Sequence, residues 1–105
     1  MSSPEEYAEA VLVLVESVPA GRATTYGAIA DVLQEQLGTG GPRTVARVMA
    51  TDGSGVPWWR CVRADGTLPG HLIAEALQSW YAEGTPVRGD RVDLPKAFWQ
   101  PSPGA

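Results

Sequence analysis

The chain has 105 residues, of which 44% are hydrophobic and 19% are charged, a composition that fits one folded domain and excludes a disordered segment. The single cysteine excludes an internal disulfide, the N-terminus is acidic where a secretory signal is basic, and no apolar run approaches a membrane span, so we expect a cytoplasmic protein without membrane contact. The formal net charge of −4 disfavours a nucleic-acid partner that is recognised by charge alone.

The acidic residues are distributed unevenly along the chain. Four of the twelve, Glu5, Glu6, Glu9 and Glu16, lie within the first seventeen residues. Between residues 18 and 65, five arginines stand against four acidic residues, which gives a local charge of +1. The middle of the chain can therefore bind phosphate modestly, with an affinity that depends on shape and specific contacts.

The N-terminal segment predicts an amphipathic helix over residues 4–17. Ser3 can cap it, Pro4 suits its first position, and Glu6 follows the serine by three residues. The apolar residues that recur at helical spacing are Tyr7, Ala8, Val11, Leu12, Val15 and Val18.

Two further helices are predicted on either side of a glycine-rich connector. The first runs from Tyr26 to about Leu37, is capped by Thr25, and turns its apolar residues inward. Residues 38–41, GTGG, then lead to a short helix over residues 42–50 that Val45, Val48 and Met49 anchor. Two short helices joined in this way resemble a helix-turn-helix.

The second half of the chain is rich in turns and then helical. Residues 59–62 predict a short extended segment, and residues 72–81 predict an amphipathic helix that ends at Glu83-Gly84. The tail, residues 85–105, contains four prolines and is predicted to be irregular but docked through Leu94, Phe98 and Trp99. We expect one mainly α domain over residues 1–105, with its core at about residues 4–84.

Cys61 raises the hypothesis of a nucleophile. A reactive thiolate needs a base or a positive field, yet Arg60 would point to the opposite side of an extended segment and His71 lies beyond a turn. A small buried hydrophobe is the favoured interpretation. One histidine and one cysteine do not make a metal site, and no GxxxxGK[ST] or GxGxxG motif is present, so no metal or cofactor is expected.

Trp58 and Trp59 form an aromatic pair in a segment framed by glycine and proline. Tryptophan usually packs in a core. The alternative is that one indole is a stacking face for a flat ligand such as a nucleobase, with an arginine nearby. Bulky aromatic residues on loops favour the binding interpretation.

Three segments resemble motifs of the O6-alkylguanine-DNA alkyltransferases, in the same order. Residues 21–30, GRATTYGAIA, resemble the GxVxTYGxIA segment, and residues 42–49, PRTVARVM, resemble the recognition helix RAVGxAM. Residues 56–62, VPWWRCV, followed by DGTL at residues 65–68, occupy the place of the active-site motif IPCHRVV and its glycine turn. The resemblance covers most of residues 5–84.

The active-site motif departs from the family at its reactive residues. Trp58 stands at the place of the alkyl-accepting cysteine, Trp59 at that of the activating histidine, and Cys61 aligns with an ordinary valine. Glu83 resembles the third catalytic residue but has no histidine–cysteine pair to support. Tryptophan in place of cysteine is the mark of the alkyltransferase-like proteins, the non-enzymatic branch of the family. Residues 94–101 also resemble the C-terminal extension of that branch. The resemblance therefore implies a protein without catalytic residues.

The resemblance also implies a fold and a function. Members of this branch are similar in fold to the transferase DNA-binding domain, a winged-helix-like helix-turn-helix. They bind double-stranded DNA that contains O6-alkylguanine, flip the damaged base into the vacated pocket, and hand it to nucleotide excision repair. We expect the same of this chain, as a monomer.

Individual residues inherit DNA-binding roles from the resemblance. Tyr26, next to Thr25, matches the tyrosine that crowds the phosphate, and Arg43 matches the arginine finger that fills the gap in the base stack. The family places this helix in the minor groove, where the small residues Thr44 and Ala46 permit close approach. We expect Arg47 to contact the DNA backbone.

The residues expected around the lesion are Tyr26, Trp58, Trp59, Arg60 and His71. Trp58 would form one wall, and Arg60 is expected to bond to the backbone or to a neighbouring carboxylate. His71 lies near the sequence position at which members of this branch can carry an arginine that senses the alkylated base. Two alternatives stay open: an alkyl transferase that uses Cys61, and a protein-interaction domain that has lost DNA binding.

Overall fold

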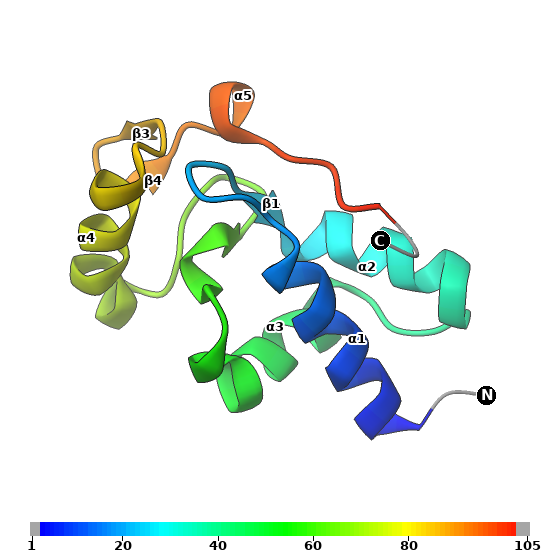
Figure 1. Ribbon diagram of the computed structural model, residues 1–105. Coiled ribbons are helices and arrows are strands. Elements are labelled where there is room, and N and C mark those ends of the chain that lie inside the picture. Colours follow the sequence, from blue (N-terminus) through cyan, green and yellow to red (C-terminus); the bar gives the residue numbers. More distant parts are fainter. Residues whose placement is uncertain (1–2, 103–105) are drawn as a thin grey trace.

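The computed structural model describes residues 3–102, and within them the chain folds into a mainly helical domain (Figure 1). In chain order the elements are α1 (Pro4–Glu16), β1 (Thr24–Thr25), α2 (Tyr26–Leu37), α3 (Pro42–Asp52), the 3-10 helices η1 (Gly53–Gly55) and η2 (Trp58–Arg60), β2 (Cys61–Val62), the 3-10 helix η3 (Gly70–Leu72), α4 (Ile73–Glu83), β3 (Val87–Arg88), β4 (Arg91–Val92) and α5 (Leu94–Ala97). The predicted mainly α fold is confirmed, and α3 continues two residues beyond its predicted end.

Both predicted helix caps are present. The Ser3 Oγ accepts a hydrogen bond from the Glu6 amide at 3.1 Å, and the Thr25 Oγ1 accepts one from the Ala28 amide at 3.0 Å. Each such cap typically stabilises a helix by about 1 kcal/mol, because it satisfies a backbone donor that the helix leaves free. The Thr25 cap also fixes where α2 begins, and therefore where Tyr26 lies.

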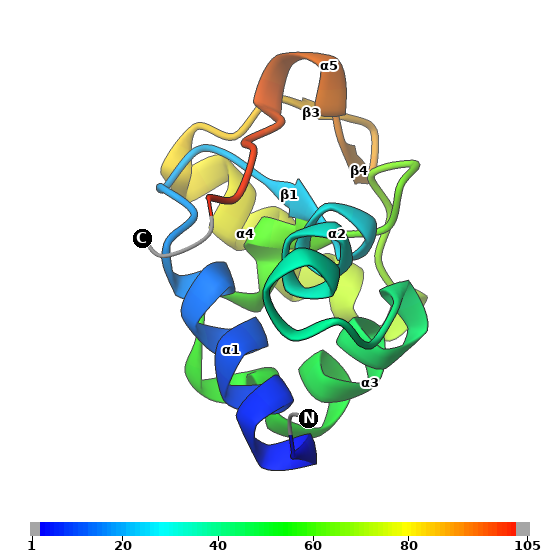
Figure 2. The ribbon, with the colours of Figure 1, turned by 90° about the vertical axis from the view of Figure 1, so that its right-hand side faces the viewer.

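A first hydrophobic cluster joins α1, α2 and α3, which lie against one another in Figure 2. Its buried members are Tyr7, Val11, Leu14, Val15, Ile29, Ala30, Val32, Leu33, Val45, Met49 and Cys61. On α1, Leu14 is buried whereas Leu12, predicted from the spacing, is only partly buried. The core face of α1 is thus rotated slightly from the predicted one.

A second cluster lies between the short parallel pair β1–β2, helix α4 and the C-terminal segment. Its buried members are Ala23, Val62, Leu68, Ala76, Trp80, Val92 and Ala97. Tyr26 and Trp58 are partly buried and pack against both clusters. These two aromatic side chains therefore stand at the junction of the two halves of the core.

The segment over residues 59–62 differs from its prediction. Residues 58–60 form the 3-10 turn η2, and only Cys61 and Val62 are extended, in β2. The reason is Pro57, whose carbonyl accepts a hydrogen bond from the Arg60 amide at 3.0 Å and closes the turn. Trp58 and Trp59 consequently do not alternate across a strand.

The C-terminal tail is docked but not irregular. Strands β3 and β4 form an antiparallel hairpin, and α5 adds one helical turn. The Ala23 amide donates to the Ala97 carbonyl at 3.0 Å, and the Ala23 carbonyl accepts from the Trp99 amide at 2.8 Å. The buried anchors of the tail are Val92, Ala97 and Pro101, whereas the predicted anchors Leu94, Phe98 and Trp99 are partly buried or exposed. Residues 103–105 of the predicted tail lie outside the described residues.

Gly66→Ala is expected to destabilise the fold by about 2 kcal/mol or more. Gly66 has a φ of 86°, and a Cβ there would lie 2.3 Å from the Val92 carbonyl oxygen. The backbone cannot yield easily, because the Gly66 carbonyl accepts a hydrogen bond from the Val92 amide at 2.9 Å. Urea denaturation measures the loss.

Gly89→Ala is the matched control for that substitution. Gly89 also has a positive φ, 63°, but a Cβ would meet nothing within 4 Å. Its cost is therefore the left-handed conformation alone, about 1–2 kcal/mol. Equal losses in the two variants would contradict the steric argument at Gly66.

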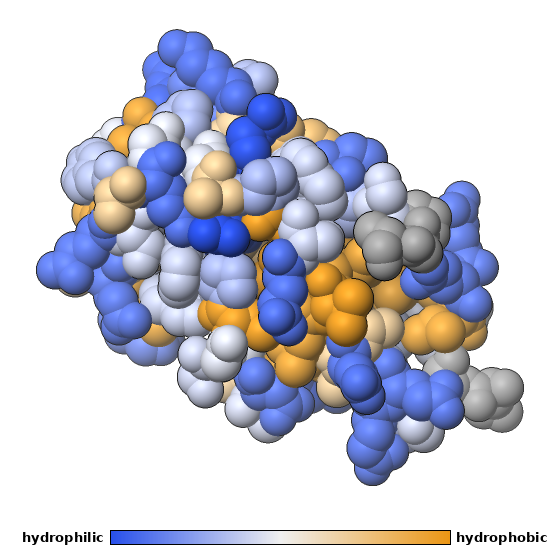
Figure 3. Space-filling model, in the orientation of Figure 1, coloured by the Kyte–Doolittle hydropathy of each residue, from blue (hydrophilic) through white to orange (hydrophobic). Residues whose placement is uncertain are grey.

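The outer surface of α1 is acidic and partly apolar. Glu5, Glu6, Glu9 and Glu16 are exposed, and Val13 is 53% exposed between them. Figure 3 shows hydrophobic surface gathered in the middle of this face and bordered by hydrophilic side chains. Within residues 3–102, none of the helices has the length and apolar character that crossing a membrane requires.

Candidate nucleic-acid interface

A cavity of about 700 Å³ lies between the start of α2, helix α3, the turn η2 and the region from β2 to α4. The predicted site residues that line it are Tyr26, Arg43, Ala46, Arg47, Trp58 and His71. They come from four separate elements, α2, α3, η2 and η3, so the fold itself gathers them. Met49, Leu68 and Leu72 add an apolar part to the wall.

Tyr26 is the first residue of α2, and its position follows from the cap at Thr25. Burial raises the pKa of the Tyr26 hydroxyl to about 12, the buried Cys61 thiol adds to the rise, and the charge of Arg63 opposes it. The hydroxyl therefore stays protonated at neutral pH and can donate a hydrogen bond to a phosphate oxygen.

Helix α3 presents two exposed arginines to the cavity. Arg43 is the second residue of the helix and Arg47 lies one turn later, with the smaller Ala46 between them. A third arginine, Arg63, lines the cavity from the residue after β2. Glu75 is the acidic residue on the wall. The rim is therefore positively charged although the whole chain is acidic.

Thr25 and Thr44 do not line this cavity. The Thr25 hydroxyl is used by the helix cap, and Thr44 lines a separate hollow of about 580 Å³ with Tyr7 and Gly40. Both threonines are partly buried. Thr25 thus supports the site indirectly, because its cap fixes Tyr26 as the first residue of α2. Thr44 lies in the first turn of α3, next to Arg43.

Trp58 lines the cavity, and Trp59 packs behind it. The two indole rings meet edge to face, with centroids 5.5 Å apart and an interplanar angle of 83°. This is a favoured arrangement of aromatic pairs. The face of Trp58 is therefore set by the position of Trp59.

Trp59 and Arg60 face Glu83 rather than the cavity. The Trp59 Nε1–H donates to Glu83 Oε2 at 3.1 Å, and the Arg60 Nε–H donates to Glu83 Oε1 at 3.1 Å. Arg60 also donates from Nη1 to the Val18 carbonyl at 3.0 Å. The expected bonding of Arg60 to backbone and carboxylate is confirmed. Trp59 and Arg60 were both predicted to lie around the lesion. Their N–H groups are instead bonded to Glu83, and neither residue lines the cavity.

The Glu83 carboxylate is held in its ionised form. Burial raises the pKa of Glu83, but the hydrogen bonds from Arg60, Trp59 and the Gly21 amide outweigh burial and hold this pKa below its ordinary value. The carboxylate is therefore a permanent acceptor at neutral pH.

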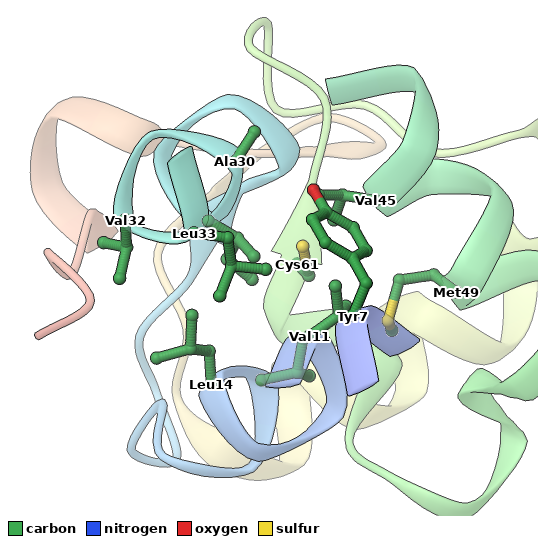
Figure 4. Close-up of a cluster of buried hydrophobic side chains, with 11 residues drawn as sticks. Tyr7, Val11, Leu14, Ala30, Val32, Leu33, Val45, Met49 and Cys61 are labelled. Atoms are coloured by element: carbon green, nitrogen blue, oxygen red, sulfur yellow. The ribbon is translucent and has the colours of Figure 1, made fainter. Parts of the chain in front are cut away.

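Cys61 is enclosed in the first hydrophobic cluster. Its side chain is 0% exposed, and Figure 4 shows the sulfur among side chains of α1, α2 and α3. Burial raises the pKa of the Cys61 thiol well above its ordinary value. A buried neutral thiol that does not line the cavity has neither access to a base nor nucleophilic character. Residues 3–102 also contain no group of three or more His, Cys, Asp and Glu placed to hold a metal ion.

Cys61 is expected to resist modification by a thiol reagent as long as the chain is folded. Exposure of the sulfur requires opening of the cluster, because its side chain has no exposed surface. Labelling with Ellman's reagent should be complete in denaturant and at least about a hundredfold slower without it. Rapid labelling of the native chain would contradict the enclosed position.

Comparison with known proteins identifies the family of the chain. Residues 6–84 match the family model described as "6-O-methylguanine DNA methyltransferase, DNA binding domain". The chain belongs to this family. The resemblance found in the three sequence motifs is thereby confirmed.

Two curated relatives carry the name DNA base-flipping protein. The one from Escherichia coli strain K12 is 31% identical over 107 residues, which cover 94% of this chain and 78% of that protein. The one from Vibrio parahaemolyticus is 28% identical, over 92% of this chain and 99% of that protein. This agrees with the predicted place of the chain on the non-enzymatic side of the family.

Solved structures with the same fold come from Schizosaccharomyces pombe. The structure of S. pombe Atl1 in complex with damaged DNA containing O6-carboxymethylguanine has a TM-score of 0.73 at 24% identity. The structure of S. pombe ATL in complex with DNA has a TM-score of 0.73 at 25% identity. Each match covers 96% of this chain and 100% of the other.

The sequence did not single out Arg63 as a site residue. It follows β2 directly, and its place on the wall depends on the pairing of β2 with β1, which puts the strand beside the start of α2. The pairing partners Thr24 and Cys61 are far apart in the chain. A local pattern carries no information about such a contact.

Proposed function

We propose that this chain binds double-stranded DNA that carries an O6-alkylguanine and receives the flipped base in the cavity beside Trp58, without transferring the alkyl group. The observation that carries the proposal is the cavity itself, which Tyr26, Arg43 and Trp58 line together from three different elements. The names of the relatives, DNA base-flipping protein, and the two S. pombe structures in complex with DNA support it.

The energetics of flipping suit an aromatic wall. Taking a base out of the duplex costs a few kcal/mol, and less when the pair is already weakened by damage. Stacking on an aromatic ring returns about 1–3 kcal/mol. Trp58 thus offsets much of the cost without forming a covalent bond.

The apolar part of the wall favours an alkylated base over guanine. Met49, Leu68 and Leu72 line the same cavity as Trp58. A buried methyl or methylene group contributes about 0.8 kcal/mol, a factor of about four in affinity. Longer alkyl groups gain more, up to the volume that the cavity provides.

The arginines and Tyr26 act on the DNA around the flipped base. We assign to α3 a position in the minor groove, with Arg43 inserted in place of the missing base. Arg47 and Arg63 contact phosphates, and Tyr26 crowds the phosphate of the flipped nucleotide. Thr25, Thr44 and Ala46 allow the two helices to approach the backbone closely.

The absence of alkyl transfer follows from the residues at the wall. The indole of Trp58 is a poor nucleophile, and Cys61, the residue of the alternative transferase hypothesis, is enclosed in the core. The bound lesion therefore remains in the DNA. We propose that the complex is a flag for nucleotide excision repair proteins in the cytoplasm and that the chain acts as a monomer.

The test compares two duplexes that differ in one base. A fluorescent duplex with one O6-methylguanine should bind at least about tenfold more tightly than the same duplex with guanine, and mass spectrometry should find no added methyl group on the chain. Equal binding to both duplexes would overturn the recognition of the lesion, and undetectable binding to both would favour the protein-interaction alternative. Stable methylation of Cys61 would establish the transferase instead.

A further inference from the structure

The Glu83 carboxylate joins three parts of the chain that are distant in sequence. It accepts hydrogen bonds from Trp59 and Arg60 in η2 and, at 3.3 Å, from the Gly21 amide in the turn before β1. Glu83 itself is the last residue of α4. The side chains of Arg60 and Glu83 form an ion pair that is 17% and 14% exposed, respectively.

We propose that Glu83 is a positioning residue for the lesion pocket: through Trp59 it sets the orientation in which Trp58 receives the flipped base. This inference rests on the proposed function. Glu83 does not line the cavity, so its effect on binding passes through η2.

The turn η2 depends on such a support. It has three residues and no side-chain cap, so its own hydrogen bonds define it weakly. Trp59 is instead fixed at two points, because its indole N–H donates to Glu83 and its carbonyl accepts from Trp80 Nε1 at 2.7 Å. The Arg60 guanidinium is also held by Glu83, and it lies 5.8 Å from the centre of the Trp59 ring.

The orientation of Trp58 follows from that of Trp59. The two rings meet at 83°, so rotation of the Trp59 ring disrupts the edge-to-face contact between them. Loss of the N–H bond to Glu83 leaves Trp59 in place by packing but frees it to rotate. The site would remain present and become loose, which costs specificity before it costs the fold.

A pair of substitutions at Trp59 separates the hydrogen bond from the ring. Trp59→Phe keeps an aromatic side chain and removes the donor, whereas Trp59→His keeps a ring N–H that can donate to Glu83. Trp59→Phe is expected to weaken binding to the O6-methylguanine duplex about tenfold, the effect of one lost hydrogen bond to a charged group, and to change binding to the guanine duplex less than about twofold. Trp59→His is expected to retain most of the discrimination.

Glu83→Gln tests the other end of the same bond and should also lower the ratio of the two affinities. Val15→Ala, in the buried face of α1 and away from the cavity, is the control for a general loss of stability. It should leave the ratio unchanged. Urea denaturation of each variant shows which of them remain folded. If Glu83→Gln does not fold, Trp59→Phe still tests the hydrogen bond, because it retains an aromatic ring at position 59.

The outcomes separate the inference from the function on which it rests. If the parent chain does not discriminate between the duplexes, the proposed function fails and this inference falls with it. If the parent discriminates and Trp59→Phe discriminates equally well, the positioning role is wrong while the function stands. A loss in Trp59→Phe that affects both duplexes alike also overturns the positioning role.

Discussion

Arg43→Ala is expected to weaken binding to a duplex with one O6-methylguanine by about tenfold or more. The side chain lies at the start of α3, exposed, and on the rim of the same cavity as Tyr26 and Trp58. In the proposed complex, the Arg43 side chain fills the gap in the base stack and keeps the flipped base from returning. Removal of this side chain is therefore expected to cost about 1–3 kcal/mol of stacking. Fluorescence anisotropy with the labelled duplex measures the change.

Arg47→Ala is the matched control, because it removes the same charge one turn further along the same exposed face. A phosphate contact carries no information on the base, so both duplexes should lose affinity alike, and the slope of log affinity against log salt should fall by about one. The role of Arg43 as a wedge is wrong if the two variants behave in the same way.

The parts of the candidate interface whose geometry depends on local rules could be predicted from the sequence. Ser3 and Thr25 cap their helices as predicted, and Tyr26 therefore begins α2. The GTGG connector and Pro42 fix the start of α3 and the exposed position of Arg43. Caps, proline and glycine act through their immediate neighbours, so their effect survives in the tertiary structure.

The β3–β4 hairpin of the tail has a local sequence motif, but the proline content of the tail led to the prediction of an irregular segment. Residues 89–90, Gly-Asp, form the two-residue connection between β3 and β4, and such a pair is a recognised hairpin motif. The prolines around it favoured an irregular tail. They lie outside the paired residues, where they do not interrupt the hydrogen bonds.

The role of Trp59 could not be predicted from the sequence. Its indole binds Glu83, 24 positions away, and that contact requires the packing of α4 against η2. The motif placed Trp59 beside Trp58 and therefore in the pocket. The 3-10 turn at Pro57 instead directs the two indoles differently, one to the cavity and one to the carboxylate.

Trp58→Ala is expected to remove most of the preference for the O6-methylguanine duplex. Trp58 is the aromatic residue of η2 on the cavity wall, and no residue behind it can take its place, because Trp59 is held at Glu83. Loss of the stacking face costs about 1–3 kcal/mol, or roughly fivefold to 150-fold in affinity. The guanine duplex, whose base stays stacked, should lose much less.

Trp58→Phe distinguishes stacking from simple filling of space. A phenyl ring keeps an aromatic face on the same backbone position, so this variant should retain a clear preference for the lesion, whereas Trp58→Leu, of similar bulk but without a π face, should not. A 2-aminopurine placed next to the lesion reports unstacking directly through its fluorescence. If Trp58→Leu binds and unstacks the duplex as well as Trp58→Phe does, the wall works by shape and apolar surface, and the stacking account of this pocket is wrong.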